Sequence, residues 1–194
     1  MKKIVLASQS PRRHALLKNL KLDFEVRVPA TVEKIDKALP PYEQAQELAR
    51  KKAWPIAREL QSGIVIGADT LVVVGDTVLG KPRDRLHAIE MLSLLSGKPH
   101  QVITGLCVVD CDSGLVLKEA EMTRVYFRSL TEQEILAYVD SGEPYDKAGG
   151  YGIQGLGALL VERIEGCYFN VVGLPLTRLY CMLKQVGLDI LTGS

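Results

Sequence analysis

Two spacings of apolar residues divide the chain into predicted strands and helices. A short apolar run at residues 3–7 leads into a polar turn at residues 8–11, and residues 12–20 then carry apolar side chains at helical spacing. Ser10 is a good N-cap for that helix, and Pro11 is favoured in its first turn. The chain is therefore predicted to open with a strand, a serine-rich turn and a helix.

The remaining pattern predicts strands and helices that do not alternate strictly. Residues 64–74 indicate a strand interrupted at residues 67–70, and residues 142–157 are typical of a long glycine-rich loop. We therefore expect an α/β protein with a partly antiparallel sheet. The other predicted elements are a half-buried strand around residues 24–28, helices over residues 42–60, 83–96, 131–138 and 174–186, and strands over residues 100–110, 115–128 and 158–164.

The composition fits a compact protein and argues against two classes of partner. The 194 residues are 47% hydrophobic, enough to bury the core of one domain or of two tightly joined lobes. The formal net charge of +1 argues against a nucleic-acid coat or a membrane-binding basic patch. The first apolar run is too short for a signal peptide and no later run reaches membrane-spanning length, so we expect a cytoplasmic protein.

The sequence SQSPRR, from Ser8 to Arg13, has the features of a phosphate-binding turn. A serine-lined helix start presents backbone N–H groups and hydroxyls at the positive end of the helix. Arg12 and Arg13 add guanidinium groups that can donate two hydrogen bonds to a phosphate. The chain contains no G-x-x-x-x-G-K-[ST] sequence, so this is not a Walker loop. The alternative is an ordinary helix start with two solvated arginines.

Asp69 is the strongest catalytic candidate, because the sequence GADT stands inside an otherwise apolar run. Burying a carboxylate there costs roughly 1–3 kcal/mol or more unless it faces a site or a partner. Gly67 permits a ligand or another backbone segment to approach closely. Such an aspartate can bind Mg²⁺ or orient a water molecule. The alternative is a hydrogen-bonded structural aspartate at a strand end.

Three lysines and one glycine-rich segment add to the candidate chemistry. Lys52, Lys81 and Lys147 can stabilise charge on phosphate oxygens, although a single lysine is more often a surface residue. The segment DKAGGYGIQG lets the backbone approach a ligand, and its Gln154 can offer a donor and an acceptor to a base edge. The alternative for this segment is a mobile surface loop.

The three histidines and Glu33 carry little signal of their own. The histidines are scattered along the chain, so neither a histidine metal site nor a Ser-His-Asp triad is supported. Glu33 stands in a polar loop, where an ordinary surface glutamate is the default expectation.

The motifs SQSPRR, a glutamate in a loop, ARKKA, GADT, GKP, ITG and DKAGGYGIQG follow one another in that order. This ordered set closely resembles the Maf family of nucleoside triphosphate pyrophosphatases, from Ala7 to about Leu176. The resemblance implies one domain over residues 1–194, with a fold like that of the inosine triphosphate pyrophosphatases: an elongated mixed sheet and two lobes flanking a cleft. It also implies metal-dependent hydrolysis between the α and β phosphates, with release of pyrophosphate.

The resemblance further implies a role for each matching residue. The metal would be Mg²⁺ or Mn²⁺, held by Asp69 and Glu33, and the protein would be a homodimer. The GADT and YGIQG motifs look like those of the branch that prefers dTTP and UTP, and modified pyrimidine triphosphates are further candidate substrates. Asp69 would accept a proton, and Lys52 and Lys81 would be catalytic lysines of the pocket. Phosphate would be contacted by Ser8, Arg12 and Arg13, and Lys147 would bind substrate. Subfamily-specific substrate recognition would fall to Arg12, Thr70 and Gln154.

Two other functions use the same motifs. A nucleotide-sensing regulator of cell division would bind a triphosphate through the same turn and glycine-rich segment without cleaving it. A phosphatase would release orthophosphate instead of pyrophosphate. The acidic pair Asp69 and Glu33 favours an enzyme, because a pure binder does not need two carboxylates beside a triphosphate.

Overall fold

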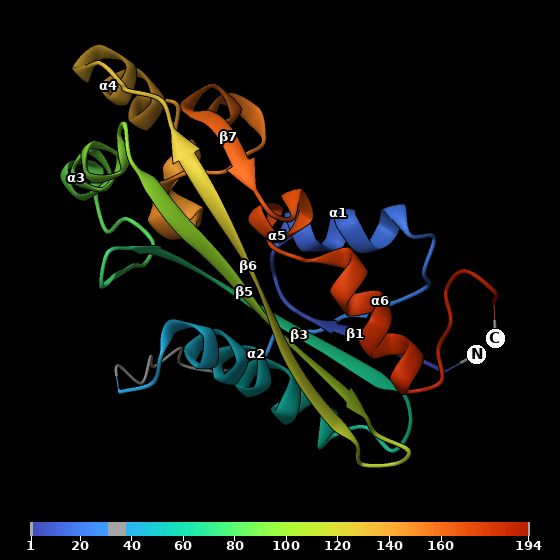
Figure 1. Ribbon diagram of the computed structural model, residues 1–194. Coiled ribbons are helices and arrows are strands. Elements are labelled where there is room, and N and C mark those ends of the chain that lie inside the picture. Colours follow the sequence, from blue (N-terminus) through green and yellow to red (C-terminus); the bar gives the residue numbers. More distant parts are fainter. Residues whose placement is uncertain (1, 31–37, 194) are drawn as a thin grey trace. The chain divides into compact units, whose positions relative to one another are not determined.

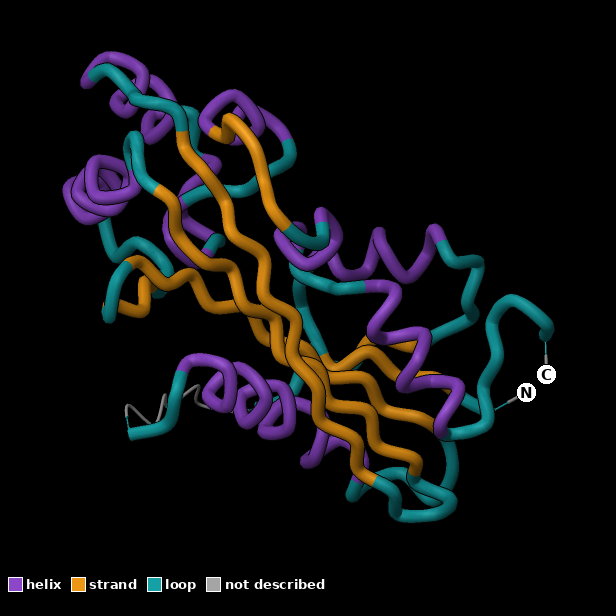
Figure 2. The backbone as a smooth tube through the Cα atoms, in the orientation of Figure 1, coloured by secondary structure: helices purple, strands orange, loops and turns teal. Residues whose placement is uncertain are grey.

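The computed structural model describes residues 2–30 and 38–193 and shows a mixed α/β fold (Figures 1 and 2). Within these residues seven strands form one sheet in the order β2-β1-β3-β5-β6-β7, and β4 pairs with β3. Strand β1 runs parallel to β2 and β3, whereas the β3–β4 and β6–β7 pairs are antiparallel. The predicted α/β class with a mixed sheet is confirmed.

The helices and strands have the following bounds. The strands are β1 (Ile4–Ala7), β2 (Glu25–Val26), β3 (Ile64–Val74), β4 (Thr77–Leu79), β5 (Pro99–Asp110), β6 (Val116–Phe127) and β7 (Val161–Glu165). The α-helices are α1 (Pro11–Asn19), α2 (Pro41–Ala57), α3 (Arg85–Leu95), α4 (Glu132–Asp140), α5 (Tyr168–Val172) and α6 (Leu176–Gln185). The 3₁₀ helices are η1 (Glu143–Asp146), η2 (Ala148–Gly150) and η3 (Gly155–Leu160).

Tertiary contacts divide the chain into two compact units, and the boundary falls inside β3, β5 and β6. Unit 1 comprises residues 1–69, 104–121 and 173–194, and unit 2 comprises residues 70–103 and 122–172. The prediction of a single domain with two lobes stays a prediction. No helix in the described part of the chain is both long and apolar enough to cross a membrane.

In unit 1, helix α2 lies so close to the sheet that only glycine fits beneath it. A Cβ atom on Gly67 of β3 would lie closer than 3.0 Å to the carbonyl oxygen of Ala49, and one on Gly105 of β5 equally close to that of Ala45. Ala45, Ala49 and Ala53 are fully buried and recur every four residues, so they share one face of α2. Small residues on both surfaces therefore set the distance between helix and sheet.

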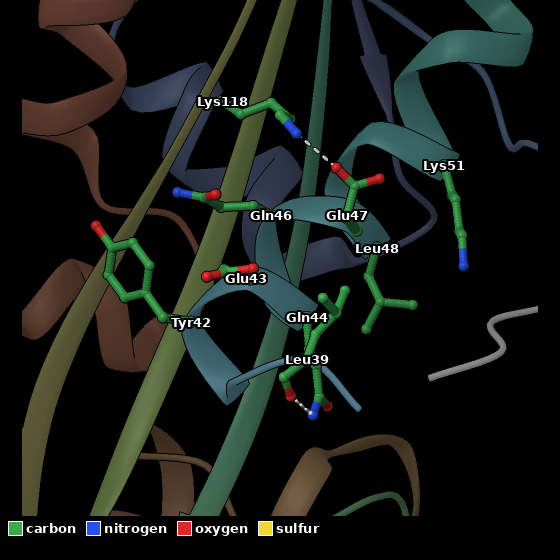
Figure 3. Close-up of a pocket in the computed structure, with 9 residues that line it drawn as sticks. All are labelled: Leu39, Tyr42, Glu43, Gln44, Gln46, Glu47, Leu48, Lys51 and Lys118. Carbon is green, nitrogen blue, oxygen red and sulfur yellow. Dashed lines mark hydrogen bonds and ion pairs between the residues drawn. The ribbon is translucent and has the colours of Figure 1, made fainter. Parts of the chain in front are cut away.

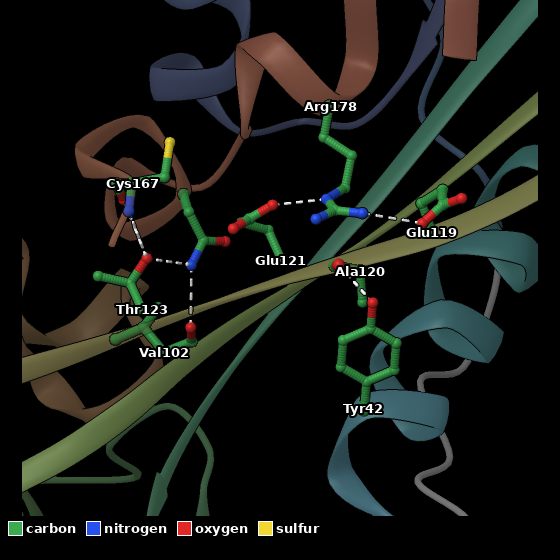
Figure 4. Close-up of polar contacts among 9 residues, drawn as sticks. Tyr42, Val102, Glu119, Ala120, Glu121, Thr123, Cys167 and Arg178 are labelled. Atoms are coloured by element: carbon green, nitrogen blue, oxygen red, sulfur yellow. Dashed lines mark hydrogen bonds and ion pairs between the residues drawn. The ribbon is translucent and has the colours of Figure 1, made fainter. Parts of the chain in front are cut away.

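On the other face of the unit 1 sheet lie α1 and α6 (Figure 1). The guanidinium of Arg178 on α6 donates hydrogen bonds to the carboxylates of Glu119 and Glu121 on β6 (Figure 4). On the α2 side, the Tyr42 hydroxyl donates to the Ala120 carbonyl of the same strand at 2.6 Å. Strand β6 is thus attached to a helix on each side.

In unit 2 the hydroxyl of Thr123 makes three hydrogen bonds. The Thr123 hydroxyl donates to the Cys167 carbonyl at 3.1 Å and accepts the Cys167 N–H at 3.0 Å and the Asn170 side-chain N–H at 2.9 Å (Figure 4). Asn170 also donates to the Val102 carbonyl at 2.9 Å. These bonds hold the five-residue helix α5, which the sequence pattern did not predict.

Four predicted elements differ in the structure. The predicted half-buried strand around residues 24–28 is reduced to the two residues of β2, both of which are exposed. The break predicted at residues 67–70 is absent, because β3 continues through all of residues 64–74. The predicted loop at residues 142–157 contains η1, η2 and the start of η3. The predicted strand at residues 158–164 is shorter and shifted, because residues 155–160 form η3 and β7 begins at Val161. The helix predicted from residue 131 is α4, and a capping box of Thr131 and Glu134 forms its start.

Gly105→Ala should lower the free energy of unfolding by about 2 kcal/mol or more, because the added methyl group meets the backbone of α2. Gly80→Ala is the matched control, since a Cβ at Gly80 meets no atom within 4 Å. That control should change stability by less than about 0.5 kcal/mol. Urea-induced unfolding followed by circular dichroism measures both. Equal stability of the two variants would contradict the close contact between α2 and β5.

Candidate active site

The centre of the site in unit 1 is an ion pair between Asp69 and Lys52. Asp69 stands two residues after Gly67 in β3, so its side chain points to the same face of the sheet, the face that α2 covers. There the Lys52 ammonium of α2 donates to Asp69 Oδ1. The side chains are only 12% and 9% exposed, respectively. The buried carboxylate is therefore paired with a cation, and Lys52 is not a surface lysine.

The serine-rich turn is folded around Arg13. Ser10 caps α1 by accepting the Arg13 N–H, and the Ser8 hydroxyl oxygen accepts the Ser10 N–H at 3.2 Å. The Arg13 side chain is buried, donating from Nε to the Gly173 carbonyl at 2.7 Å and from a terminal nitrogen to Ser8 Oγ at 3.3 Å. Arg13 thus ties the turn to the segment before α6. Arg12, in the same helical turn, is half-buried.

In unit 2 three segments with predicted site residues are joined to one another. The Gly149 N–H donates to the Gly80 carbonyl at 2.9 Å, so the segment of Lys81 is tied to the glycine-rich segment. Val72, two residues after Thr70 in β3, packs where a side chain on Gly149 would stand. Unit 2 therefore gathers Thr70, Lys81, Lys147 and Gln154 on neighbouring segments, and unit 1 holds Ser8, Arg12, Arg13, Lys52 and Asp69. Glu33 lies outside the described residues.

Lys147 is already engaged within its own segment. Its ammonium donates to the Glu143 carbonyl at 2.5 Å and to Asp146 Oδ1 at 2.6 Å, and its side chain is 14% exposed. The alkyl chain fills the space beside Gly152, where an added Cβ would meet its Cε at 2.9 Å. Substrate binding by Lys147 stays a prediction, and it would require the ammonium to share or exchange these partners.

Tyr151 anchors the glycine-rich segment in the core of unit 2. A hydrogen bond of 2.6 Å joins its hydroxyl to His100 Nε2, and its ring packs edge-on against Phe127. Both His100 and Tyr151 are buried, and burial lowers the pKa of His100 to about 4. The sequence pattern did not single out His100, since its only signal was a histidine at the start of an apolar strand.

The described residues contain no group of three or more His, Cys, Asp or Glu side chains that could hold a metal ion. Asp69 nevertheless fits the usual mode of Mg²⁺, which takes one or two carboxylates and completes its coordination with water and substrate phosphates. Its carboxylate supplies the hard oxygen donor that this mode requires. Of the two predicted metal ligands, only Asp69 lies in the described part of the chain.

A separate pocket of about 680 Å³ lies along α2, near Lys51, Leu48 and Gln44 (Figure 3). None of its lining residues is a predicted site residue. Consecutive residues of an α-helix point about 100° apart, so Lys51 can line this pocket while Lys52 points to Asp69. The chemistry of the Asp69–Lys52 pair is therefore not located in this pocket.

Comparison with known families decides the assignment. Residues 3–186 match the family described as Maf-like protein. The chain belongs to the Maf family. Its Maf relatives include the dTTP/UTP pyrophosphatase of Desulforamulus reducens, 48% identical over 190 residues that cover 98% of this chain and 100% of that protein. The dTTP/UTP pyrophosphatase of Syntrophomonas wolfei is 51% identical over 189 residues, covering 96% and 98% of the two chains.

A solved structure, that of the Staphylococcus aureus Ham1 protein, also aligns with this Maf chain. It covers 65% of this chain and 72% of its own, with 17% sequence identity and a TM-score of 0.46. The Maf assignment rests on the sequence matches and not on this likeness.

The free energy of unfolding should decrease as the pH is lowered, because His100 is buried in its neutral form. The folded-state pKa of about 4 lies below the usual 6.5, so the unfolded chain takes up a proton first as the pH falls. The stability that neutral His100 contributes is present above pH 6.5 and is lost towards pH 4. Between pH 7 and pH 5 the free energy of unfolding should drop by about 2 kcal/mol from this group.

Urea-induced unfolding at the two pH values checks this expectation. In the double variant His100→Phe/Tyr151→Phe both partners of this hydrogen bond become apolar, so neither residue of the pair is left as a polar group without the other. This variant should lose about 2 kcal/mol less than the unsubstituted protein between pH 7 and pH 5. An unchanged pH dependence in the double variant would show that His100 is not the responsible group.

Proposed function

We propose that this Maf protein hydrolyses dTTP and UTP to the nucleoside monophosphate and pyrophosphate. The observation that carries the proposal is the near full-length identity of 48% and 51% to two proteins named dTTP/UTP pyrophosphatase. The buried Asp69–Lys52 pair supports an enzyme, because it provides a carboxylate and a cation at one point beside the strand. A sensor that only binds a triphosphate does not need that pair.

In this proposal Asp69 accepts the proton of the attacking water. Its carboxylate is held in one orientation by Lys52, and a general base must be fixed in this way to act in the transition state. Lys52 also stabilises negative charge that develops on the phosphate oxygens, as Lys81 does from its Gly–Pro frame. The bond between the α phosphorus and the bridging oxygen breaks, and pyrophosphate leaves.

The serine-rich turn is the proposed site of phosphate contact. Ser8 and Arg12 supply a hydroxyl and a guanidinium at the positive end of α1. Arg13, which donates to Gly173 and Ser8, contributes by keeping the turn in shape as well as by its charge. The triphosphate therefore meets fixed donors in this turn.

The proposed cofactor is Mg²⁺ or Mn²⁺, with Asp69 as one ligand and Glu33 as the second. A bound divalent cation would supply charge neutralisation of the triphosphate and Lewis-acid polarisation of a phosphate oxygen. With the cation bound, the proposed roles of the side chains stay the same: Asp69 accepts the proton of the water, and Lys52 orients Asp69. A cytoplasmic location and a homodimer complete the proposal.

Base recognition is assigned to Gln154, with Thr70 on the neighbouring strand as a second contact. The Gln154 side chain is exposed and carries both a carbonyl acceptor and an amide donor. The pyrimidine edge of uracil or thymine offers an N–H donor and carbonyl acceptors that match these groups. Arg12 is the third residue proposed to distinguish substrates.

Asp69→Asn should reduce the release of pyrophosphate from dTTP by roughly 100-fold or more, since asparagine cannot accept the proton of the water. The fold should remain, because the amide oxygen can still accept from Lys52. Asp110→Asn is the matched control: Asp110 is also buried and paired with a lysine, Lys2 at 2.9 Å, but lies in no predicted motif. This control should turn over dTTP as the unsubstituted enzyme does.

The same assay measures pyrophosphate and orthophosphate separately, with Mg²⁺, with Mn²⁺ and with a chelator. Pyrophosphate and dTMP should form in equal amounts, and the chelator should stop the reaction until the metal is restored. Orthophosphate as the product would replace the proposed reaction with a phosphatase. Full activity in Asp69→Asn would remove Asp69 from its assigned role.

Gln154→Ala should erode the preference for dTTP over dATP by about tenfold or more, while slowing dATP hydrolysis far less. A site built to hydrogen-bond a base edge loses discrimination when one partner is removed. Steady-state kcat/KM for both nucleotides gives the ratio. An equal loss on both nucleotides would refute base reading by Gln154.

A further inference from the structure

The Glu143 carboxylate caps the backbone that follows Gln154. Its Oε1 accepts the N–H of Leu156 at 3.0 Å, and its Oε2 accepts the N–H of Gly157 at 3.3 Å. Both N–H groups belong to the first turn of η3, where no intrahelical acceptor is available to them. A carboxylate from η1 therefore fixes the start of η3 at a sequence separation of 13.

The contact extends to the residue next to Gln154. Gly155 has a φ of +65°, a conformation that side chains rarely permit, and a Cβ there would lie 2.7 Å from Glu143 Oε1. Glu143 thus occupies the space that any side chain at this position would need. Gln154 itself is the extended residue immediately before η3, with a φ of −101° and a ψ of 164°.

Glu143 also holds the other end of the same segment. Its backbone carbonyl accepts the Lys147 ammonium at 2.5 Å, and the alkyl chain of Lys147 lies beside Gly152. One residue therefore binds the segment before Gln154 through its carbonyl and after Gln154 through its carboxylate. Between these two attachments the Gln154 side chain is exposed.

We propose that Glu143 is a positioning residue for substrate specificity: its carboxylate holds Gln154 at the angle at which that side chain reads a pyrimidine base. The proposal rests on the proposed function, in which Gln154 contacts the base. Hydrogen bonds weaken steeply when they are misaligned, so a Gln154 side chain on a loosened backbone binds the pyrimidine base less well and discriminates less between bases. Fixing the backbone before the substrate arrives also removes part of the ordering cost of recognition.

The test measures kcat and KM for dTTP and dATP in Glu143→Ala, Glu143→Gln, Gln154→Ala and the double variant Glu143→Ala/Gln154→Ala. Glu143→Ala should lower the dTTP/dATP ratio of kcat/KM roughly tenfold, mainly through KM for dTTP. Glu143→Gln, which keeps one acceptor oxygen for the two N–H groups, should fall between the alanine variant and the unsubstituted enzyme. Glu162→Ala, at an exposed position on β7, is the control and should leave the ratio unchanged.

The double variant separates positioning from a general structural effect. If Glu143 acts through Gln154, its removal has no further effect on the ratio once Gln154 is alanine. Equal losses on dTTP and dATP in Glu143→Ala, or losses that multiply in the double variant, would overturn the proposal. If neither Glu143 variant shows the circular dichroism of a folded protein, Glu143 is a stability residue and the proposal also fails. Absence of pyrophosphate release from dTTP by the unsubstituted enzyme would instead refute the proposed function.

Discussion

Helix α2 lies against β3 and β5 with no side chain between its backbone and Gly67 or Gly105. At this distance the Lys52 ammonium reaches the carboxylate of Asp69, which stands on the same face of β3 as Gly67. A larger residue at either glycine would push the helix outward and lengthen the ion pair. The ion pair of Lys52 and Asp69 therefore depends on glycine, which has no side chain, at positions 67 and 105 of the sheet.

The glycine-rich segment illustrates the opposite use of small residues. A sequence with many glycines is commonly a flexible linker, yet this one is attached at Gly149 and Tyr151 by hydrogen bonds to two other parts of unit 2. Its glycines make room for Val72, Lys147 and Glu143 rather than for motion. Ordered backbone of this kind can present a single exposed side chain in a fixed direction.

Local signals in the sequence predicted the elements whose ends are determined by neighbouring residues. The Ser10 cap of α1 and the start of α4 after Thr131 are of this kind. The sequence pattern did not predict the continuity of β3 through Asp69, because the cation that pairs with this carboxylate is Lys52 of helix α2. Helix α5 was missed for a similar reason, since Asn170 holds it through Val102, 68 residues away.

In the candidate site, too, the sequence predicted some features and missed others. The residue types at Asp69, Lys52 and Gln154 were recognisable from ordered motifs. The engagement of Arg13 with Gly173 and of Lys147 with Glu143 was not, because a motif names a side chain and not its partner. Both contacts join positions whose proximity only the folded backbone establishes.

The path of the chain through the two units has a consequence for synthesis on the ribosome. The chain passes from one unit to the other four times, and unit 1 receives its last segment from residue 173 onward. Unit 2 has all of its residues once position 172 has been added. The amino-terminal strand β1 and helix α2, although made first, must wait for the carboxyl-terminal helix α6 before their unit is whole. Unit 2 therefore has all of its residues before unit 1 does, and a product that ended before residue 173 would lack the helix that completes unit 1.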